Sequence, residues 1–167
     1  MTFILLLGLE LILLFIAFQD FKTRSVSWVL FPIAYVLGLI NSSLDLSYRE
    51  LGTYLVINTG IILILILILL LYLVIRYGRP GLKLGNFLGS GDVLFFFIIS
   101  TCFSPINFIL FCFVSFLLAL IISVLFISKK TTIALAGWQA IVLSLVLLFQ
   151  YSSVINPYNE YWIFKLI

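Results

Sequence analysis

Residues 61–75 read IILILILILLLYLVI, an almost pure run of isoleucine and leucine that has no polar face. A helix that is apolar all round is either buried in a large core or embedded in a membrane. With the apolar residues before it, the run covers 53–75, enough for the about 20 residues that a transmembrane helix needs. We therefore predict a membrane-spanning helix here that serves as scaffold and contacts lipid.

The composition extends this prediction to the whole chain. Of the 167 residues, 65% are hydrophobic and only 9% are charged, and the mean hydropathy is +1.36. An ordinary soluble domain has roughly 25% charged residues. We expect an integral membrane protein surrounded by the lipid bilayer. The net charge of +3 includes no basic run interleaved with aromatic residues, so no nucleic-acid partner is predicted.

Five further apolar segments accompany the first one, and all six are predicted to be helices. The predicted fold is therefore an all-α, polytopic membrane bundle of about six transmembrane helices, in which residues 1–150 form one domain and 151–167 form an interfacial tail. The first segment lacks the basic start and small-residue cleavage site of a removable signal peptide, so we expect it to stay as a helix. The six segments are 1–19, 27–41, 53–75, 86–103, 106–127 and 132–150.

The fourth segment has the least certain start. Val93 to Phe103 comprises only 11 residues, which is about 16 Å of helix and too short to cross roughly 30 Å of hydrocarbon. A crossing helix would have to begin near Asn86, which places Asp92 about 9 Å along it. The glycine-rich connection 76–91 before it is a possible lid over a site.

The basic residues predict the orientation in the membrane. With the N-terminus outside, seven of the nine lie on the cytoplasmic side and two lie outside. Asp20 and Asp92 then both fall at the cytoplasmic ends of their helices, although they are far apart in sequence. The seven are Lys22, Arg24, Arg76, Arg79, Lys83, Lys129 and Lys130, and the two are Arg49 and Lys165.

Asp20 and Asp92 are the candidate catalytic residues. Carboxylates are costly near hydrocarbon and usually face a bundle interior or a wet cavity. Two carboxyl groups held close together share one proton, so the ionised member can deprotonate water while the protonated member hydrogen-bonds a carbonyl. This chemistry hydrolyses an amide without a metal or an organic cofactor. Gly89 and Gly91 lack Cβ atoms and allow another helix or a peptide to approach Asp92 closely.

The segments around both aspartates resemble the type IV prepilin peptidase family, which are membrane aspartic endopeptidases of the GxGD class. Residues 20–26, DFKTRSV, are similar to the family's first motif, and 89–93, GSGDV, to its second. A softer likeness is IALAG at 133–137. The resemblance implies that Asp20 and Asp92 are the catalytic pair. Gly89, Gly91 and Arg24 are the candidate substrate-binding or supporting residues.

The same resemblance implies a substrate and a location. The substrates of this family are type IV pilin-like precursors, whose leader is cut at the cytoplasmic face of the prokaryotic inner membrane. Ser27 and Leu94 stand where members often have proline and lysine, which affects substrate positioning more than chemistry. The likeness is closest to short, peptidase-only members without the methyltransferase segment.

Other interpretations of these residues remain open. Asp20 could pair with Arg24 at the surface, and Asp92 could cap the fourth helix. Glu10, midway along the first segment, is expected to make an interhelical hydrogen bond in its protonated form, and a role in substrate binding is the alternative. Two other functions also fit: a small proton-coupled transporter or channel subunit that uses Glu10, Asp20 and Asp92, and a non-catalytic relative that binds pilins without cutting them.

A metal site is not predicted. Cys102 and Cys112 lack a paired motif, and the chain has no histidine to complete a zinc set. Both thiols are expected to be packing residues. Asn58, Gln139 and Gln150 are expected to make polar contacts between helices, and Gly137 to be a point of close packing.

Overall fold

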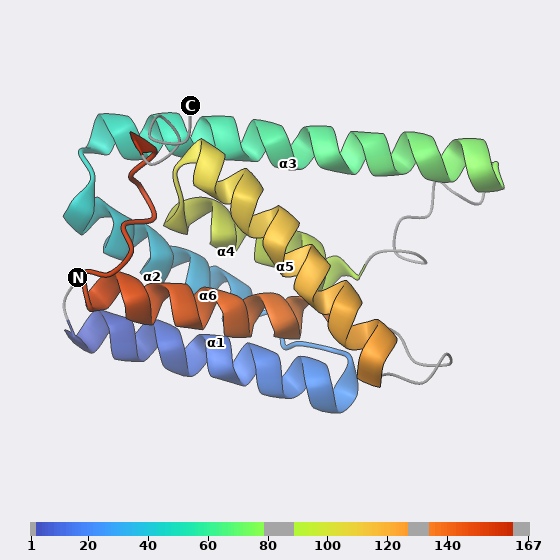
Figure 1. Cartoon of the computed structure of the whole chain (residues 1–167), viewed down its shortest axis with the longest axis horizontal. Helices are drawn as coiled ribbons and strands as arrows, with labels where there is room; N and C mark the ends of the chain where they lie inside the picture. The colour runs from blue at the N-terminus through green and yellow to red at the C-terminus, as the bar shows by residue number, and fades with distance from the viewer. Residues whose placement is uncertain (1–2, 79–88, 127–133, 162–167) are drawn as a thin grey trace.

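The computed structural model describes residues 3–78, 89–126 and 134–161, and within these ranges it contains six helices and no strand, as predicted (Figure 1). Three of the helices are long and apolar enough to cross a membrane, namely α1, α3 and α5. The other three are apolar but shorter. The helices are α1 (Phe3–Thr23), α2 (Leu30–Asp45), α3 (Tyr48–Tyr77), α4 (Ser90–Cys102), α5 (Pro105–Phe126) and α6 (Leu135–Tyr151).

Local signals set the bounds of α3, which extends beyond the predicted 53–75 at both ends. Its start is a capping box in which the Ser47 hydroxyl accepts from the Glu50 amide and the Glu50 carboxylate accepts from the Ser47 amide. Its end is Gly78, whose φ of 68° favours a residue without a Cβ atom. The resulting 30 residues give about 45 Å of helix, and α3 visibly extends past its neighbours in Figure 1.

The start of α4 differs from the prediction. The helix begins at Ser90, after an extended Gly89 with φ −62° and ψ 136°, so the expected start near Asn86 was wrong. Asp92 is the third residue of the helix, about 3 Å from its start rather than about 9 Å. Gly89 explains the difference, because it has an extended backbone and glycine loses the most backbone entropy in a helix. Most of the predicted 76–91 lid, residues 79–88, lies outside the described residues.

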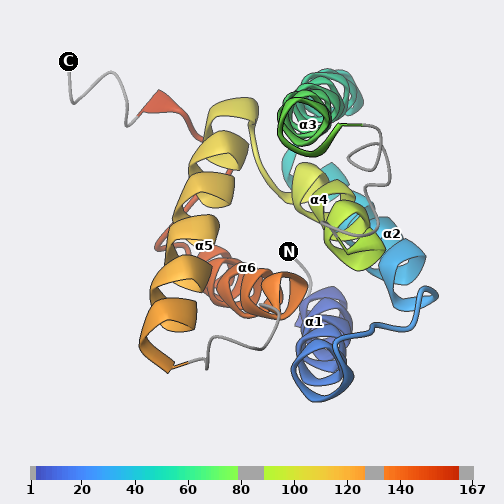
Figure 2. The same cartoon turned by 90° about the vertical axis from the view of Figure 1, so that its right-hand side faces the viewer.

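Successive helices run in opposite directions, so that the ends of α1, α3 and α5 and the starts of α4 and α6 gather on one side of the bundle (Figure 1). The N-terminus and residues 151–161 lie at the opposite end. Among the helices, α1 packs most extensively on α6, and α2 packs on α4. Figure 2, an end-on view, shows α6 lying between α1 and α5.

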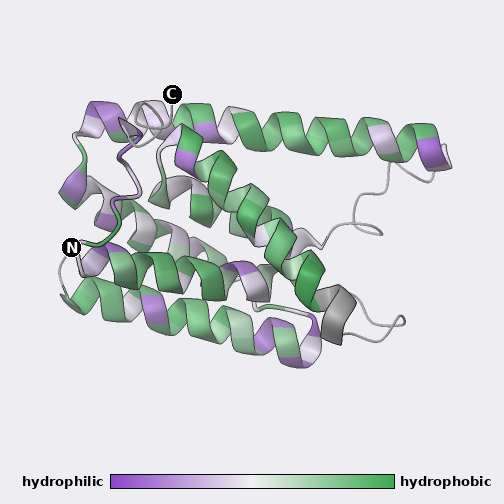
Figure 3. Ribbon diagram, viewed as in Figure 1, coloured by the Kyte–Doolittle hydropathy of each residue, from purple (hydrophilic) through white to green (hydrophobic). Residues whose placement is uncertain are grey.

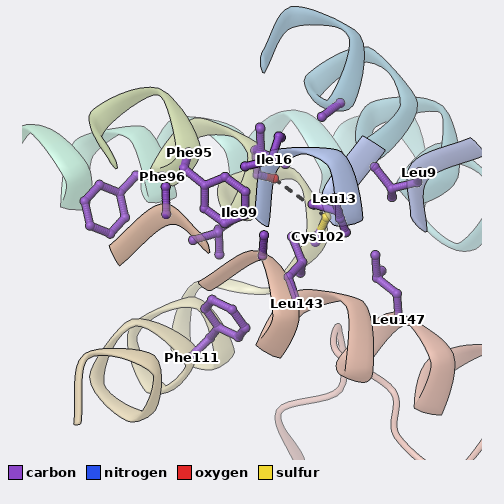
Figure 4. Close-up of a cluster of buried hydrophobic side chains, with 14 of the residues drawn as sticks. Leu9, Leu13, Ile16, Phe95, Phe96, Ile99, Cys102, Phe111, Leu143 and Leu147 are labelled. Carbon is purple, nitrogen blue, oxygen red and sulfur yellow. Dashed lines mark hydrogen bonds between the residues drawn. The ribbon is translucent and has the colours of Figure 1, made fainter. Parts of the chain in front are cut away.

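The core is formed where α1, α4 and α6 meet. Leu13 and Ile16 of α1 face Phe95 and Ile99 of α4 and Leu143 of α6 in Figure 4, and all five are fully buried. Cys102 and Cys112 are free thiols buried in the same cluster, which fits their predicted packing role. Hydrophobic residues also cover the outside of the helices, whereas polar residues gather toward the ends (Figure 3). An apolar exterior of this kind is suited to lipid.

Polar side chains link the helices as predicted. Asn58 of α3 donates to the carbonyl oxygens of Ser100 and Phe103 at 2.9 and 3.0 Å. Gln139 of α6 donates to the Ser115 hydroxyl at 3.5 Å, and Gln150 to the Asp45 carboxylate at 2.8 Å. In a membrane such bonds contribute specificity between helices whose apolar surfaces lipid would cover equally well.

The segment after α6 folds back onto the bundle. The Asn107 amide donates to the carbonyl oxygens of Pro157 and Asn159 at 2.9 and 3.0 Å, and the Tyr158 hydroxyl lies 2.8 Å from that of Ser42. Burial raises the pKa of the Tyr158 phenol above its ordinary value, so this group remains neutral. The contacts hold residues 157–159 against α2 and α5 at the end of the bundle opposite to both aspartates.

Candidate active site

Asp20 lies in the last turn of α1 and is buried, with 8% of its surface exposed. It continues the stripe formed by Leu9, Leu13 and Ile16, whose three- and four-residue spacing places all of them on the face toward α6. Its Oδ2 accepts a hydrogen bond from the backbone N–H of Gly137 at 2.6 Å. The apolar pattern of α1 thus places the Asp20 carboxylate next to the first turn of α6.

Asp92 reaches the same turn of α6 from α4. It is partly buried, and its Oδ1 accepts a hydrogen bond from the backbone N–H of Ala136 at 3.0 Å. Its Oδ2 lies against Gly89, where a Cβ atom would come within 3.0 Å of that oxygen. A Cβ atom on Gly91 would lie 3.3 Å from the ring of Phe31 on α2. Both glycines therefore permit close approaches around Asp92, as their pattern suggested.

The two aspartates converge on consecutive residues. Ala136 and Gly137 are the second and third residues of α6, and their N–H groups are among those that a helix leaves without an intrahelical partner. The N-cap residue, Ala134, makes no side-chain capping bond. Carboxylates from two other helices supply the acceptors instead, and they are close enough to interact electrostatically. The structure therefore brings together residues that are 72 positions apart in sequence.

Arg24 follows α1 and is exposed. It has a φ of 54°, and its backbone N–H donates to the Asp20 carbonyl oxygen at 3.1 Å. Its charge interacts favourably with the Asp20 carboxylate. Among the described residues, however, the hydrogen-bond donor to that carboxylate is the Gly137 N–H. A surface ion pair with Arg24 therefore does not by itself account for the position of Asp20.

Gly137 is the residue of this site whose importance the sequence understated. A Cβ atom there would lie 3.1 Å from Oδ2 of Asp20, and 3.3 Å from both its Cβ and the Cε1 of Phe21. The predicted close packing is therefore confirmed, and the partner is the aspartate itself. Beside it, the rings of Phe21 and Trp138 meet edge to face with centroids 5.1 Å apart. The signal in the sequence that could have indicated the importance of Gly137 was the likeness of residues 133–137 to a family segment.

Glu10 occupies a separate place in the core. It accepts a hydrogen bond from the Ser144 hydroxyl of α6, which is the predicted interhelical contact. The buried side chains of α1 between Glu10 and Asp20 are apolar, namely Leu13, Ile16 and Ala17. The part of α1 that the structure describes therefore offers no polar relay from Glu10 to the aspartate pair, which disfavours the transporter interpretation.

The polar groups of the site are two carboxylates, which accept hydrogen bonds, and two backbone amides, which donate them. Within residues 3–78, 89–126 and 134–161, no group of three or more cysteine, aspartate or glutamate side chains lies together in a way that could hold a metal ion. Two acids that share a proton can instead act directly on water and on a carbonyl group.

Comparison with known proteins gave one finding. The model of the type IV leader peptidase family matches residues 7–125, a range that contains both aspartates and runs from α1 into α5. No curated protein and no solved structure matched the chain.

Proposed function

The chain belongs to the type IV leader peptidase family, and from this premise we propose that it is an aspartic endopeptidase that removes the leader from type IV pilin-like precursors. Asp20 and Asp92 are the proposed catalytic residues. The observation that carries the proposal is their convergence on adjacent amides of α6. Capping the start of α6 is compatible with this role, because a pair that shares one proton needs its two carboxylates close together.

In the proposed reaction, one ionised carboxylate takes a proton from a water molecule as the water oxygen attacks the carbonyl carbon of the scissile amide. The protonated partner donates its proton to the carbonyl oxygen, which gives a tetrahedral diol. When the C–N bond breaks, the first carboxyl protonates the leaving nitrogen and a diol proton returns to the second. Either aspartate can fill either role, because the pair titrates as a unit.

Gly89, Gly91 and Arg24 are proposed to support this pair. Gly89 lets the Asp92 carboxylate lie against the backbone, and Gly91 lets the Phe31 ring of α2 approach α4 next to Asp92. The Arg24 charge acts on Asp20 from the surface side. Neither function requires contact with the reacting atoms.

The proposed location is a prokaryotic cytoplasmic membrane that the chain crosses several times, with the N-terminus outside. Asp20 and Asp92 lie at the end of the bundle that also carries Lys22, Arg24 and Arg76, which supports a cytoplasmic site. A leader cut at the cytoplasmic face would reach the pair without crossing the membrane.

The test is cleavage of a co-expressed pilin-like precursor, followed by mass spectrometry of its N-terminus. Asp20→Asn and Asp92→Asn should each abolish cleavage while the protein still inserts into the membrane. The matched control is Asp45→Asn, because Asp45 is an exposed carboxylate at the opposite end of the bundle, where it accepts from Gln150. Full cleavage by either active-site variant would reject the pair, and an uncut precursor with the unmodified protein would favour a non-catalytic pilin-binding relative.

A further inference from the structure

We propose that the first turn of α6 is the positioning element of the aspartate pair, through the main-chain N–H groups of Ala136 and Gly137. This inference rests on the proposed function and adds a third helix to the site. It gives Gly137 a specific role, namely to present its amide to Asp20 without a side chain in between.

The packing of the helices is the first argument. The backbones of α1 and α4, which carry the aspartates, approach each other at most marginally, whereas both approach α6. The side chains of α1 and α4 meet in the core, but close backbone packing between these two helices does not set the distance between the carboxylates. Each carboxylate is bound to α6 instead, and the two donors are successive residues of one rigid helix. The separation of the two donor N–H groups is fixed by helix geometry, in which successive residues are about 1.5 Å apart along the axis.

The nature of the donors is the second argument. The first amides of a helix have no intrahelical acceptor, so α6 can give both to the aspartates without losing a bond of its own. The N-terminal end of a helix is also its positive end, which favours a carboxylate there. Hydrogen bonds to an ionised acceptor are stronger than neutral ones. The turn therefore holds the carboxylates in place and stabilises the single negative charge that they share.

The space around Gly137 is the third argument. The atoms nearest to an added Cβ include the Asp20 Cβ, which is tied to the backbone of α1 and cannot swing away. A side chain at 137 would therefore push α1 and α6 apart, and Asp20 would move relative to Asp92. The edge-to-face contact of Phe21 and Trp138 at the same level holds the two helices in register.

Two substitutions test the role of this turn. Gly137→Ala keeps the amide but adds the Cβ atom, and Ala136→Pro removes the N–H that Asp92 accepts while leaving the intrahelical bonds intact. Each has a matched control. Gly60→Ala adds a Cβ atom to a helix where nothing lies within 4 Å, and Tyr48→Pro places proline at the first position of α3, after an extended Ser47 and at the opposite end of the bundle from both aspartates.

The expected result concerns kcat rather than KM, measured with purified protein in detergent and a synthetic precursor peptide. Gly137→Ala and Ala136→Pro should lower kcat by roughly 10- to 100-fold, the scale of a sub-ångström to 1 Å misplacement, with KM changed by less than about twofold. Gly60→Ala and Tyr48→Pro should keep kcat within about twofold of the unmodified protein. Thermal unfolding of every variant shows that the assay compares folded proteins.

The outcomes separate this inference from the proposed function. If Asp20→Asn is inactive while Gly137→Ala keeps its full kcat, the turn of α6 is not a positioning element although the catalytic pair stands. A rise in KM with unchanged kcat would also overturn the inference, because it would assign the turn to substrate binding. If Asp20→Asn itself cleaves, the proposed function fails, whatever Gly137→Ala does.

Discussion

Asn58 attaches a lipid-exposed helix to the bundle, and its replacement by alanine gives a quantitative test of the fold. α3 is mostly exposed, and its buried residues are Asn58, Ile62 and Leu73. The fully buried Asn58 amide donates to the carbonyl oxygens of Ser100 and Phe103, at the C-terminal end of α4. Carbonyls at a helix end have no intrahelical partner, so Asn58→Ala leaves both of them without a donor.

The size of the effect follows from the two hydrogen bonds. Interhelical bonds in membrane proteins average about 0.6 kcal/mol and reach about 1.7 kcal/mol, so two of them contribute about 1.2 to 3.4 kcal/mol. For a protein of this size, 1 kcal/mol shifts Tm by about 2–4 °C. Asn58→Ala should therefore lower Tm by roughly 2 to 14 °C.

The assay is thermal unfolding in detergent, with Thr53→Ala as the control. Thr53 lies on the same helix but is exposed, and its hydroxyl donates to the Arg49 carbonyl within α3 at 2.9 Å, so its loss should leave Tm nearly unchanged. Below its Tm, Asn58→Ala should still cleave precursor, because Asp92 is at the other end of α4. An unchanged Tm, or loss of cleavage in the folded variant, would refute this account of α3.

Two further predictions concern packing and buried charge. Gly38→Ala should lower Tm, because an added Cβ atom would collide with the Thr101 hydroxyl. The control, Gly60→Ala, should keep or raise Tm. Equal effects of the two variants in the same thermal scan would contradict the packing of α2 on α4. Ser144→Ala should destabilise by about 1–3 kcal/mol, because it leaves the buried Glu10 carboxyl without its donor, and Glu10→Gln in the same background should recover part of the loss. Unfolding scans of Ser144→Ala and of the double variant check this, and no recovery would argue against that contact.

Much of the fold could be predicted because a membrane requires long apolar helices and an asymmetric distribution of basic residues. Apolar runs gave six helices, and the distribution of basic residues predicted which ends lie together. The first and last residues of the helices were harder to predict from the sequence. The capping box of Ser47 and Glu50 lengthened α3, and the extended Gly89 delayed the start of α4. Local backbone preferences thus override a length argument based on bilayer thickness.

The site was predictable only in its side chains. Asp20 and Asp92 stand out in an apolar sequence, since charge near hydrocarbon needs a reason. Their partners do not stand out, because every residue except proline carries an N–H group and no pattern marks which one is used. Gly137 was predicted as a packing point, but the neighbour that requires its small size depends on how α1 docks on α6.

The pairing of the first helix with the last has a consequence for biosynthesis. Asp20 and the amide that binds it are 117 positions apart, which a ribosome translates in roughly 6 to 23 s. Asp92 is synthesised within that interval, but the N–H groups that bind the two acids exist only once the start of α6 has been made. A truncated or stalled polypeptide would thus be inert, and proteolytic competence would arrive only when synthesis of the final hairpin is complete.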